Sequence, residues 1–113
     1  MQINLTTKEI TVGTPLRSYL DRKVQKLERL CHDKSDIVAT VELDYTRPNP
    51  RRKGEQFRCE VNLDCRSWGV RFRAEATGIT PEAAIDLVEE EVERQILKRK
   101  GKTLKARRQK NKE

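Results

Sequence analysis

Three consecutive stretches of this chain, residues 37–46, 57–65 and 70–77, alternate apolar and polar side chains with a period of two. This period is typical of a β-strand that has one face against a core and the other in solvent. A basic loop (residues 47–55) and a tight turn (residues 66–69) connect the three stretches. We therefore expect three antiparallel strands joined by hairpins. The apolar positions are Ile37, Ala39, Val41, Leu43 and Tyr45 in the first, Phe57, Cys59, Val61, Leu63 and Cys65 in the second, and Val70, Phe72, Ala74 and Ala76 in the third.

Two amphipathic helices flank these strands, and both begin with the same dipeptide. Thr14-Pro15 and Thr80-Pro81 each combine a residue that can cap free backbone N–H groups with a proline suited to the first helical position. We expect the first helix to run to about Cys31. The apolar stripes, at three- and four-residue spacing, are Leu16, Leu20, Val24, Leu27 and Cys31 in the first helix and Ala84, Ile85, Val88, Val92 and Ile96 in the second.

A short strand at residues 2–5 precedes the first helix, and residues 6–13 read as a connector. The order is therefore strand, helix, three strands, helix. Because each strand has one apolar face and each helix one apolar stripe, the economical packing places both helices on one face of the sheet. The first helix is a crossover, which sets the first two strands parallel if they are neighbours. The expected fold class is α+β, a βαβββα arrangement with two helices on one face of a four-stranded mixed sheet.

At 113 residues, the chain is expected to form one folded domain over residues 1–101, followed by a basic, flexible tail over residues 102–113. No apolar run approaches the roughly 18 residues that a membrane span needs. The N-terminus lacks the pattern of a signal peptide. An odd number of cysteines without such a signal favours free thiols in a reducing compartment, so we expect a cytoplasmic protein. We also expect a monomer.

Positive charge is concentrated at the C-terminal end of the chain. Residues 94–113 hold ten Lys or Arg and one acid, a net charge of +9, whereas the whole chain carries +7. The first 93 residues therefore sum to about −2. The first helix adds a smaller basic flank formed by Arg22, Lys26 and Arg29, bordered by Lys23. This distribution indicates a protein that meets a polyanion.

Several strings in the sequence match one known family in register. They are Met1–Thr6 in the first strand, Leu16-Arg17, Lys23 and Lys26–Glu28 in the first helix, and Ala83–Asp86 and Arg94-Gln95 in the last helix. On these strings, residues 1–105 resemble the ribosome hibernation promoting factors, also called ribosome-associated inhibitors or ribosomal subunit interface proteins. The resemblance implies a fold similar to double-stranded-RNA-binding domains. It also implies binding to the small ribosomal subunit on the path of mRNA and the A- and P-site tRNAs, which would inhibit translation and stabilise inactive ribosomes.

The same resemblance implies which side chains meet ribosomal RNA. By position they are Lys23 and Lys26 on the first helix and Arg94 and Lys98 on the last. Position 91, where many relatives carry lysine, is Glu91 in this chain. Residue spacing extends the same surface to Arg22, Arg29, Arg99, Lys100 and Lys102. Additional RNA contacts are expected from the basic loop and the tail, at Arg47, Arg51, Arg52, Lys53, Lys105, Arg107 and Arg108.

Other interpretations of individual residues compete with these. Trp68 could stack on a nucleotide, although capping the edge of the core is favoured. Cys59 and Cys65 read as core thiols rather than metal ligands. Because no phosphate-cradling glycine loop and no nucleophile motif are present, we expect no enzyme, no cofactor, no metal site and no small-molecule substrate.

Three alternative functions stay open at this point. One is a general structured-RNA-binding or RNA-chaperone protein without ribosome specificity. Another is a small enzyme that uses the acids between Glu82 and Glu93, which the helix dipole and solvent also explain. A third is a protein–protein adaptor that uses the outer face of the sheet, where the charged residues are Arg58, Glu60, Arg71, Arg73 and Glu75.

Overall fold

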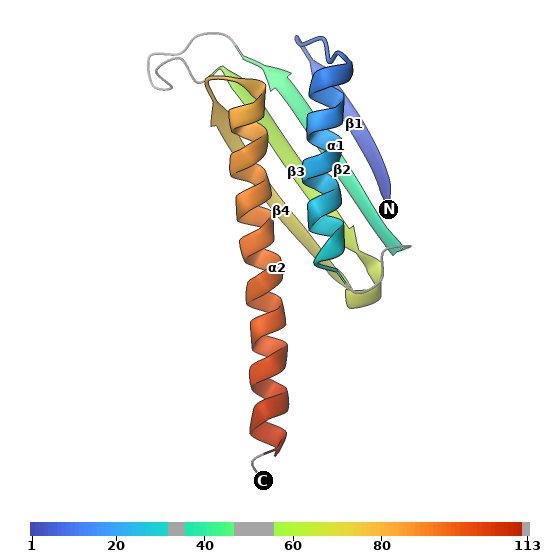
Figure 1. Cartoon of the computed structure of the whole chain (residues 1–113), viewed down its shortest axis with the longest axis vertical. Coiled ribbons are helices and arrows are strands. Elements are labelled where there is room, and N and C mark those ends of the chain that lie inside the picture. Colours follow the sequence, from blue (N-terminus) through green and yellow to red (C-terminus); the bar gives the residue numbers. More distant parts are fainter. Residues whose placement is uncertain (32–35, 47–55, 112–113) are drawn as a thin grey trace.

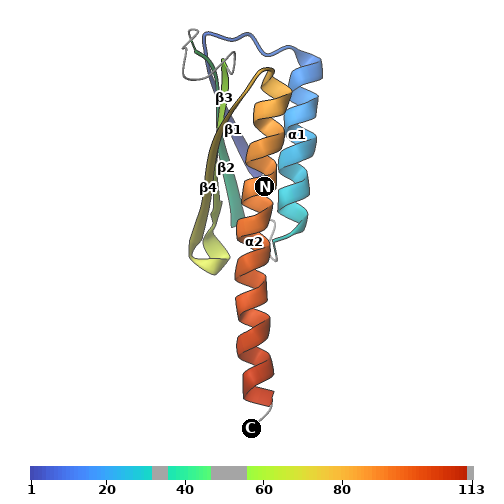
Figure 2. The ribbon, with the colours of Figure 1, turned by 90° about the vertical axis from the view of Figure 1, so that its left-hand side faces the viewer.

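A computed structural model describes residues 1–31, 36–46 and 56–111, and only the backbone of residues 102–111. One four-stranded sheet carries both helices on the same face (Figures 1 and 2). The strand order is β1-β2-β3-β4, with β1 parallel to β2 and the other neighbours antiparallel. This confirms the expected βαβββα fold. The elements are β1 (Gln2–Lys8), α1 (Thr14–Arg29), β2 (Ile37–Tyr45), β3 (Phe57–Cys65), the 3₁₀ turn η2 (Arg66–Trp68), β4 (Val70–Gly78) and α2 (Pro81–Asn111).

The core lies between the sheet and the two helices. The alternation of the strands places most of their apolar side chains toward the helices, and both helical stripes pack against them, with Leu16 partly buried. Phe57, Val70 and Ala76 are also only partly buried, and Tyr45, at the end of β2, is 36% exposed. Its ring packs edge-to-face against Phe57 at a centroid distance of 5.2 Å. The buried apolar side chains are Leu20, Val24, Leu27, Cys31, Ile37, Ala39, Val41, Leu43, Cys59, Val61, Leu63, Cys65, Phe72, Ala74, Ala84, Ile85, Val88, Val92 and Ile96.

The two helix starts differ, although their dipeptides are the same. The Thr80 hydroxyl accepts a hydrogen bond of 3.0 Å from the backbone N–H of Ala83, so this cap is confirmed. Thr14 is already inside α1, and the cap position falls on Gly13, which makes no side-chain cap. The prediction of a Thr14 cap was therefore wrong. The helix also ends at Arg29, two residues before Cys31.

One further bound differs from that expected. β1 extends to Lys8, three residues beyond the predicted strand, because its backbone follows the register of β2. α2 continues as helix through Gly101 to Asn111, so it projects well past the sheet (Figure 1). The sequence after Gly101 has no proline and contains several strong helix formers, while one glycine within a helix costs only about 1 kcal/mol. The division into a domain and a tail at this point stays a prediction.

Two glycines stand where the backbone leaves no room for another residue or adopts a conformation that other residues rarely adopt. Gly69 closes the β3–β4 connection with a φ of 64°, a conformation that L side chains rarely adopt. Gly78 lets α2 begin close to the end of β4, because a Cβ there would lie 2.7 Å from the backbone nitrogen of Ala84. These close connections set the position of α2 on the sheet, and thereby the surface that it shares with α1.

Candidate nucleic-acid interface

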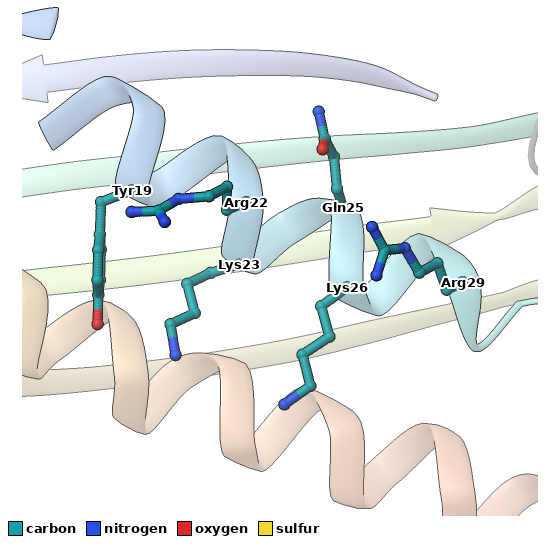
Figure 3. Close-up of a pocket in the computed structure, with 6 residues that line it drawn as sticks. All are labelled: Tyr19, Arg22, Lys23, Gln25, Lys26 and Arg29. Carbon is teal, nitrogen blue, oxygen red and sulfur yellow. The ribbon is translucent and has the colours of Figure 1, made fainter. Parts of the chain in front are cut away.

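The outward side of α1 forms a shallow hollow lined by long polar side chains. Tyr19, Lys23 and Lys26 point toward α2, whereas Gln25 points away from it (Figure 3). The helical spacing explains this division, since Lys23 and Lys26 each come one residue before a buried residue of the α1 stripe, whereas Gln25 comes one residue after the buried Val24. The hollow therefore joins the exposed side of α1 to its border with α2. Its lining residues are Tyr19, Arg22, Lys23, Gln25, Lys26 and Arg29.

The two lysines implied as RNA contacts on α1 are engaged with carboxylates of α2. Lys23 Nζ lies 3.2 Å from Asp86 Oδ1, and Lys26 Nζ lies 3.1 Å from Glu89 Oε1 and 3.7 Å from Glu93 Oε2. Asp86 raises the pKa of the Lys23 ammonium, and Glu89 raises the pKa of the Lys26 ammonium. We call these five residues the interhelical seam. It holds two lysines and three carboxylates, so its formal charge is −1.

Glu89 is the buried member of this seam. Its side chain is only 5% exposed, and its Oε1 atom accepts no well-aligned hydrogen bond from the described residues. The ammonium of Lys26 therefore supplies the main compensation for a charge held away from water. Asp86 is less buried and also accepts a hydrogen bond from the Tyr19 hydroxyl, which raises the pKa of Tyr19.

The arginines of the hollow have a different environment. Arg22 and Arg29 are exposed, and neither forms an ion pair within the described part of the chain. Each lies two residues from a buried position of the stripe, which places it about 200° around the helix, facing away from the sheet. The Arg22 guanidinium lies 5.8 Å from the centroid of the Tyr19 ring. We call Arg22 and Arg29 the α1 ridge.

A second cationic ridge lies on α2. Arg94 and Lys98 are exposed and stand opposite the buried Val92 and Ile96, so they form the α2 ridge. Arg94 is 74% exposed and pairs with Glu91 one turn away, at 3.0 Å. Such exposed pairs within a helix are weak, and they leave the cation available.

Arg99, another expected RNA contact, is involved in packing. Its guanidinium lies 5.6 Å from the centroid of the Trp68 ring and donates a hydrogen bond of 3.3 Å to the Trp68 carbonyl oxygen. Trp68 itself packs edge-to-face on Phe72 and lies against the core. The preferred interpretation of Trp68, a cap on the core edge, therefore agrees with its position. Lys100 is half-buried.

On the outer sheet face, which the helices leave uncovered, the arginines are paired with carboxylates of the same face. Arg58 contacts four carboxylates, those of Glu42, Asp44, Glu60 and Glu75. On β4, Arg71 pairs with Asp64 and Arg73 pairs with Glu60 and Glu75. On strands β2 to β4 this face has five carboxylates and three arginines. It differs from the helix side, where the two ridges leave cations available to a polyanion.

Several expected contacts lie outside the described side chains. These are Arg47, Arg51, Arg52 and Lys53 in the basic loop and Lys102, Lys105, Arg107 and Arg108 near the C-terminus. Their role in RNA binding stays a prediction.

The cysteines behave as core residues. Cys31, Cys59 and Cys65 are free and buried, and burial raises the pKa of Cys59 and of Cys65 to about 12. The sulfur atoms of Cys31 and Cys65 lie 3.4 Å apart. Within the residues described, no group of three or more His, Cys, Asp or Glu side chains is arranged to hold a metal ion. The described helices also include none that is long and apolar enough to cross a membrane.

The sequence alone did not lead us to predict the interhelical seam or a hydrogen-bonded contact between α2 and β4. The sequence interpretation assigned Asp86, Glu89 and Glu93 to the helix dipole and solvent, although Asp86 and Glu89 are three residues apart, as Lys23 and Lys26 are on α1. It also missed Gln95, whose side-chain amide exchanges hydrogen bonds with the backbone N–H and C=O of Arg73. This contact occupies backbone groups on the free edge of β4.

The fold and the two ridges define a small α+β domain with two groups of exposed cations on its helix side. Residues 3–104 match the family model described as Sigma 54 modulation protein / S30EA ribosomal protein, and the chain belongs to this family. It is 32% identical over 112 residues to the ribosome hibernation promotion factor of Lactococcus lactis subsp. cremoris, covering 98% of this chain and 55% of that protein. It is 33% identical over 108 residues to the protein of the same name from Deinococcus radiodurans, and this match covers 95% of this chain and 53% of that protein. The chain thus spans about half the length of these two relatives.

Solved structures agree on the fold. The Thermus thermophilus Protein Y N-terminal domain superposes with a TM-score of 0.67 at 24% identity, covering 85% of this chain and 96% of that one. A ribosomal subunit interface protein from Coxiella burnetii gives a TM-score of 0.65 at 19% identity, and the match covers 89% of this chain and 99% of that chain. At these identities the likeness supports the architecture alone.

Proposed function

We propose that this chain is a ribosome-binding hibernation factor that occupies the path of mRNA and the A- and P-site tRNAs on the small subunit. Membership of the family and the names of the curated relatives support a ribosomal partner. The observation that carries the proposal is the difference between the two sides of the molecule. The helix side presents the available cations of the α1 and α2 ridges, and the outer sheet face is internally paired.

The mechanism is occupancy, and it needs no bond to be made or broken. The ridges meet phosphates of ribosomal RNA, whose helices are recognised mainly by backbone shape and charge. The sheet beneath the helices fixes their backbones, so only the side chains of the ridges need to be ordered on binding. The bound domain blocks mRNA and tRNA, and it holds the ribosome in an inactive state in the cytoplasm.

Co-sedimentation with purified ribosomes across a salt series tests this proposal. The informative variant is Arg22→Gln/Arg29→Gln, because these side chains are exposed and removing them breaks no ion pair within the described chain. The matched control is Arg71→Gln/Arg73→Gln, which removes the same charge from the outer sheet face. We expect the ridge variant to bind more weakly and its salt slope to fall by about 0.7–0.9 per lost phosphate contact.

Specificity is judged in the same assay by competition. The wild type should saturate near one copy per ribosome and be displaced by mRNA together with tRNA. Equal binding to ribosomes and to an unrelated RNA duplex, without saturation or competition, would refute the proposal. That outcome would favour the alternative of a general RNA-binding protein.

A further inference from the structure

The helix side of the molecule is not a continuous cationic surface. The α1 ridge and the α2 ridge are separated by the interhelical seam, in which α2 supplies three carboxylates against two lysines of α1. Figure 3 shows Lys23 and Lys26 pointing toward α2. A phosphate chain that crossed from one ridge to the other would therefore meet net negative charge between them.

Moving a seam lysine away from its carboxylate to contact a phosphate would also cost free energy. If Lys26 turned away to contact a phosphate, the Glu89 carboxylate would be left buried at 5% exposure without its cation. A buried charge that loses its partner is strongly destabilising, whereas an exposed pair is easily exchanged. Lys23 is held more loosely, because Asp86 is 41% exposed and also has the Tyr19 hydroxyl as a partner.

We propose that Asp86, Glu89 and Glu93 are specificity-determining residues, which lower the affinity for generic RNA and thereby favour the ribosomal partner. This inference rests on the proposed function. A uniform row of cations would bind any duplex, since phosphate attraction is independent of sequence. In the seam, Lys23 and Lys26 are paired with three carboxylates, so they attract RNA less. The net negative charge of the seam also repels phosphates that lie over it. An RNA surface is accepted without penalty only where its phosphates stand over the two ridges and leave the seam uncovered.

The variant that tests this inference is Asp86→Asn/Glu93→Gln. Both side chains are partly exposed, at 41% and 29%, and the amides keep nearly the same shape. The amide that replaces the Asp86 carboxylate keeps an oxygen that can accept the hydrogen bond from the Tyr19 hydroxyl, and the buried Glu89 is left with Lys26. The matched control is Asp21→Asn/Glu28→Gln, which removes the same two charges from the opposite flank of α1, where Asp21 pairs with Arg17. Far-UV circular dichroism and a thermal melt establish that both variants are folded.

The measurement is the dissociation constant for a generic RNA duplex of about 20 base pairs and for purified ribosomes, each over a salt series. For the duplex, the seam variant should bind several-fold more tightly than the control. Its slope of log K against log salt should also be steeper by up to about 0.9, because the variant releases one lysine, Lys23, while Lys26 stays paired with Glu89. For ribosomes, the dissociation constants of the seam variant and the control should differ by less than about twofold. The ratio of ribosome affinity to duplex affinity should therefore be smaller in the seam variant.

Two results would overturn the inference. One is a duplex affinity and slope that are the same in the seam variant as in the control. The other is an equal gain for duplex and ribosome, which would show a general charge effect without specificity. The proposed function fails separately, if the wild type shows no preference for ribosomes. In that case the duplex slopes alone would still show whether the carboxylates neutralise the lysines.

Discussion

Replacing Arg58 by methionine should destabilise the fold more than any other single change on the outer sheet face. The register of the sheet places Glu42 opposite Glu60, and Glu60 opposite Glu75, so three glutamates form a row across neighbouring strands. Like charges directly opposite each other destabilise a sheet. Arg58 offsets this repulsion, because its guanidinium contacts all three glutamates and also lies 2.7 Å from Asp44 Oδ2.

The size of the effect follows from the burial of these groups. Arg58 is 18% exposed, and two of its partners, Asp44 and Glu60, are 17% and 12% exposed. Losing charge-assisted hydrogen bonds to such carboxylates costs about 1.5–3 kcal/mol. Glu42 and Glu75 are nearly half exposed, so their pairs add less than about 1 kcal/mol each. The free energy of unfolding should therefore fall by about 2–4 kcal/mol at neutral pH, a large share of the roughly 5–15 kcal/mol that stabilises a domain.

The loss should also depend on pH. The hydrogen bond from Arg58 lowers the pKa of Glu75. Burial alone would raise the pKa of Glu60, but hydrogen bonds from Asn62 and Arg73, with the charges of Arg73 and Arg58, lower it. A carboxylate with a lowered pKa stabilises the fold above its unfolded pKa of roughly 4.3, and this stability is lost as the pH falls through the folded value. The difference between wild type and variant should therefore be full at pH 7 and shrink below about pH 4.

The assay is urea unfolding followed by far-UV circular dichroism, at pH 7 and at pH 3.5. Arg71→Met is the matched control, because Arg71 is 64% exposed and Asp64 is its one ion-pair partner among the described residues. It should change the unfolding curve only slightly. The reasoning fails if Arg58→Met unfolds within about 0.5 kcal/mol of wild type at pH 7, the range expected for an ordinary surface substitution. It also fails if the loss is as large at pH 3.5 as at pH 7.

The glycines and cysteines give three further predictions. Gly69→Ala should lower the free energy of unfolding in urea by about 1–2 kcal/mol, because its φ is 64°, and an unchanged value would contradict this. Gly101→Ala should instead raise helicity, since an added Cβ meets nothing within 4 Å, and a decrease would contradict it. Cys59 and Cys65, whose pKa values burial raises to about 12, should resist iodoacetamide at pH 7.5 until urea unfolds the chain. Mass spectrometry reports the modification, and rapid labelling of the folded protein would disprove the expectation.

The strands were the most predictable part of this fold, for a physical reason. Two-residue alternation determines which face of a strand is buried, and a shift by one residue would expose every apolar side chain. The pairs Ile37–Cys65 and Leu63–Phe72 show that the inward positions meet across the sheet. The end of β1 was less predictable. Thr6, Thr7 and Lys8 carry no apolar signal, and they are held in the strand by backbone pairing with β2.

The candidate site was predictable in composition but not in its pairing. The charge pattern indicates which helices carry cations, because residues within one helix have known relative positions. Whether a lysine of α1 faces solvent or a carboxylate of α2 depends on how far the helices stand apart and on their rotation about their axes. These quantities follow from packing on the sheet. The sequence therefore indicated a basic flank on α1 but could not separate its paired lysines from its available arginines.

This separation determines how variants of the RNA-binding surface should be interpreted. Charge reversal at Lys26 would place a carboxylate beside the buried Glu89 and the partly buried Glu93. A loss of ribosome binding in that variant would combine a missing contact with a disturbed α1–α2 packing. Glutamine at Arg22 and Arg29 removes charge without breaking an ion pair among the described residues, so a loss of binding there is not complicated by an unpaired carboxylate. If instead the lysine substitutions reduced the salt slope as much as the arginine substitutions while the fold stayed intact, the seam would open on binding and its carboxylates would not restrain the lysines.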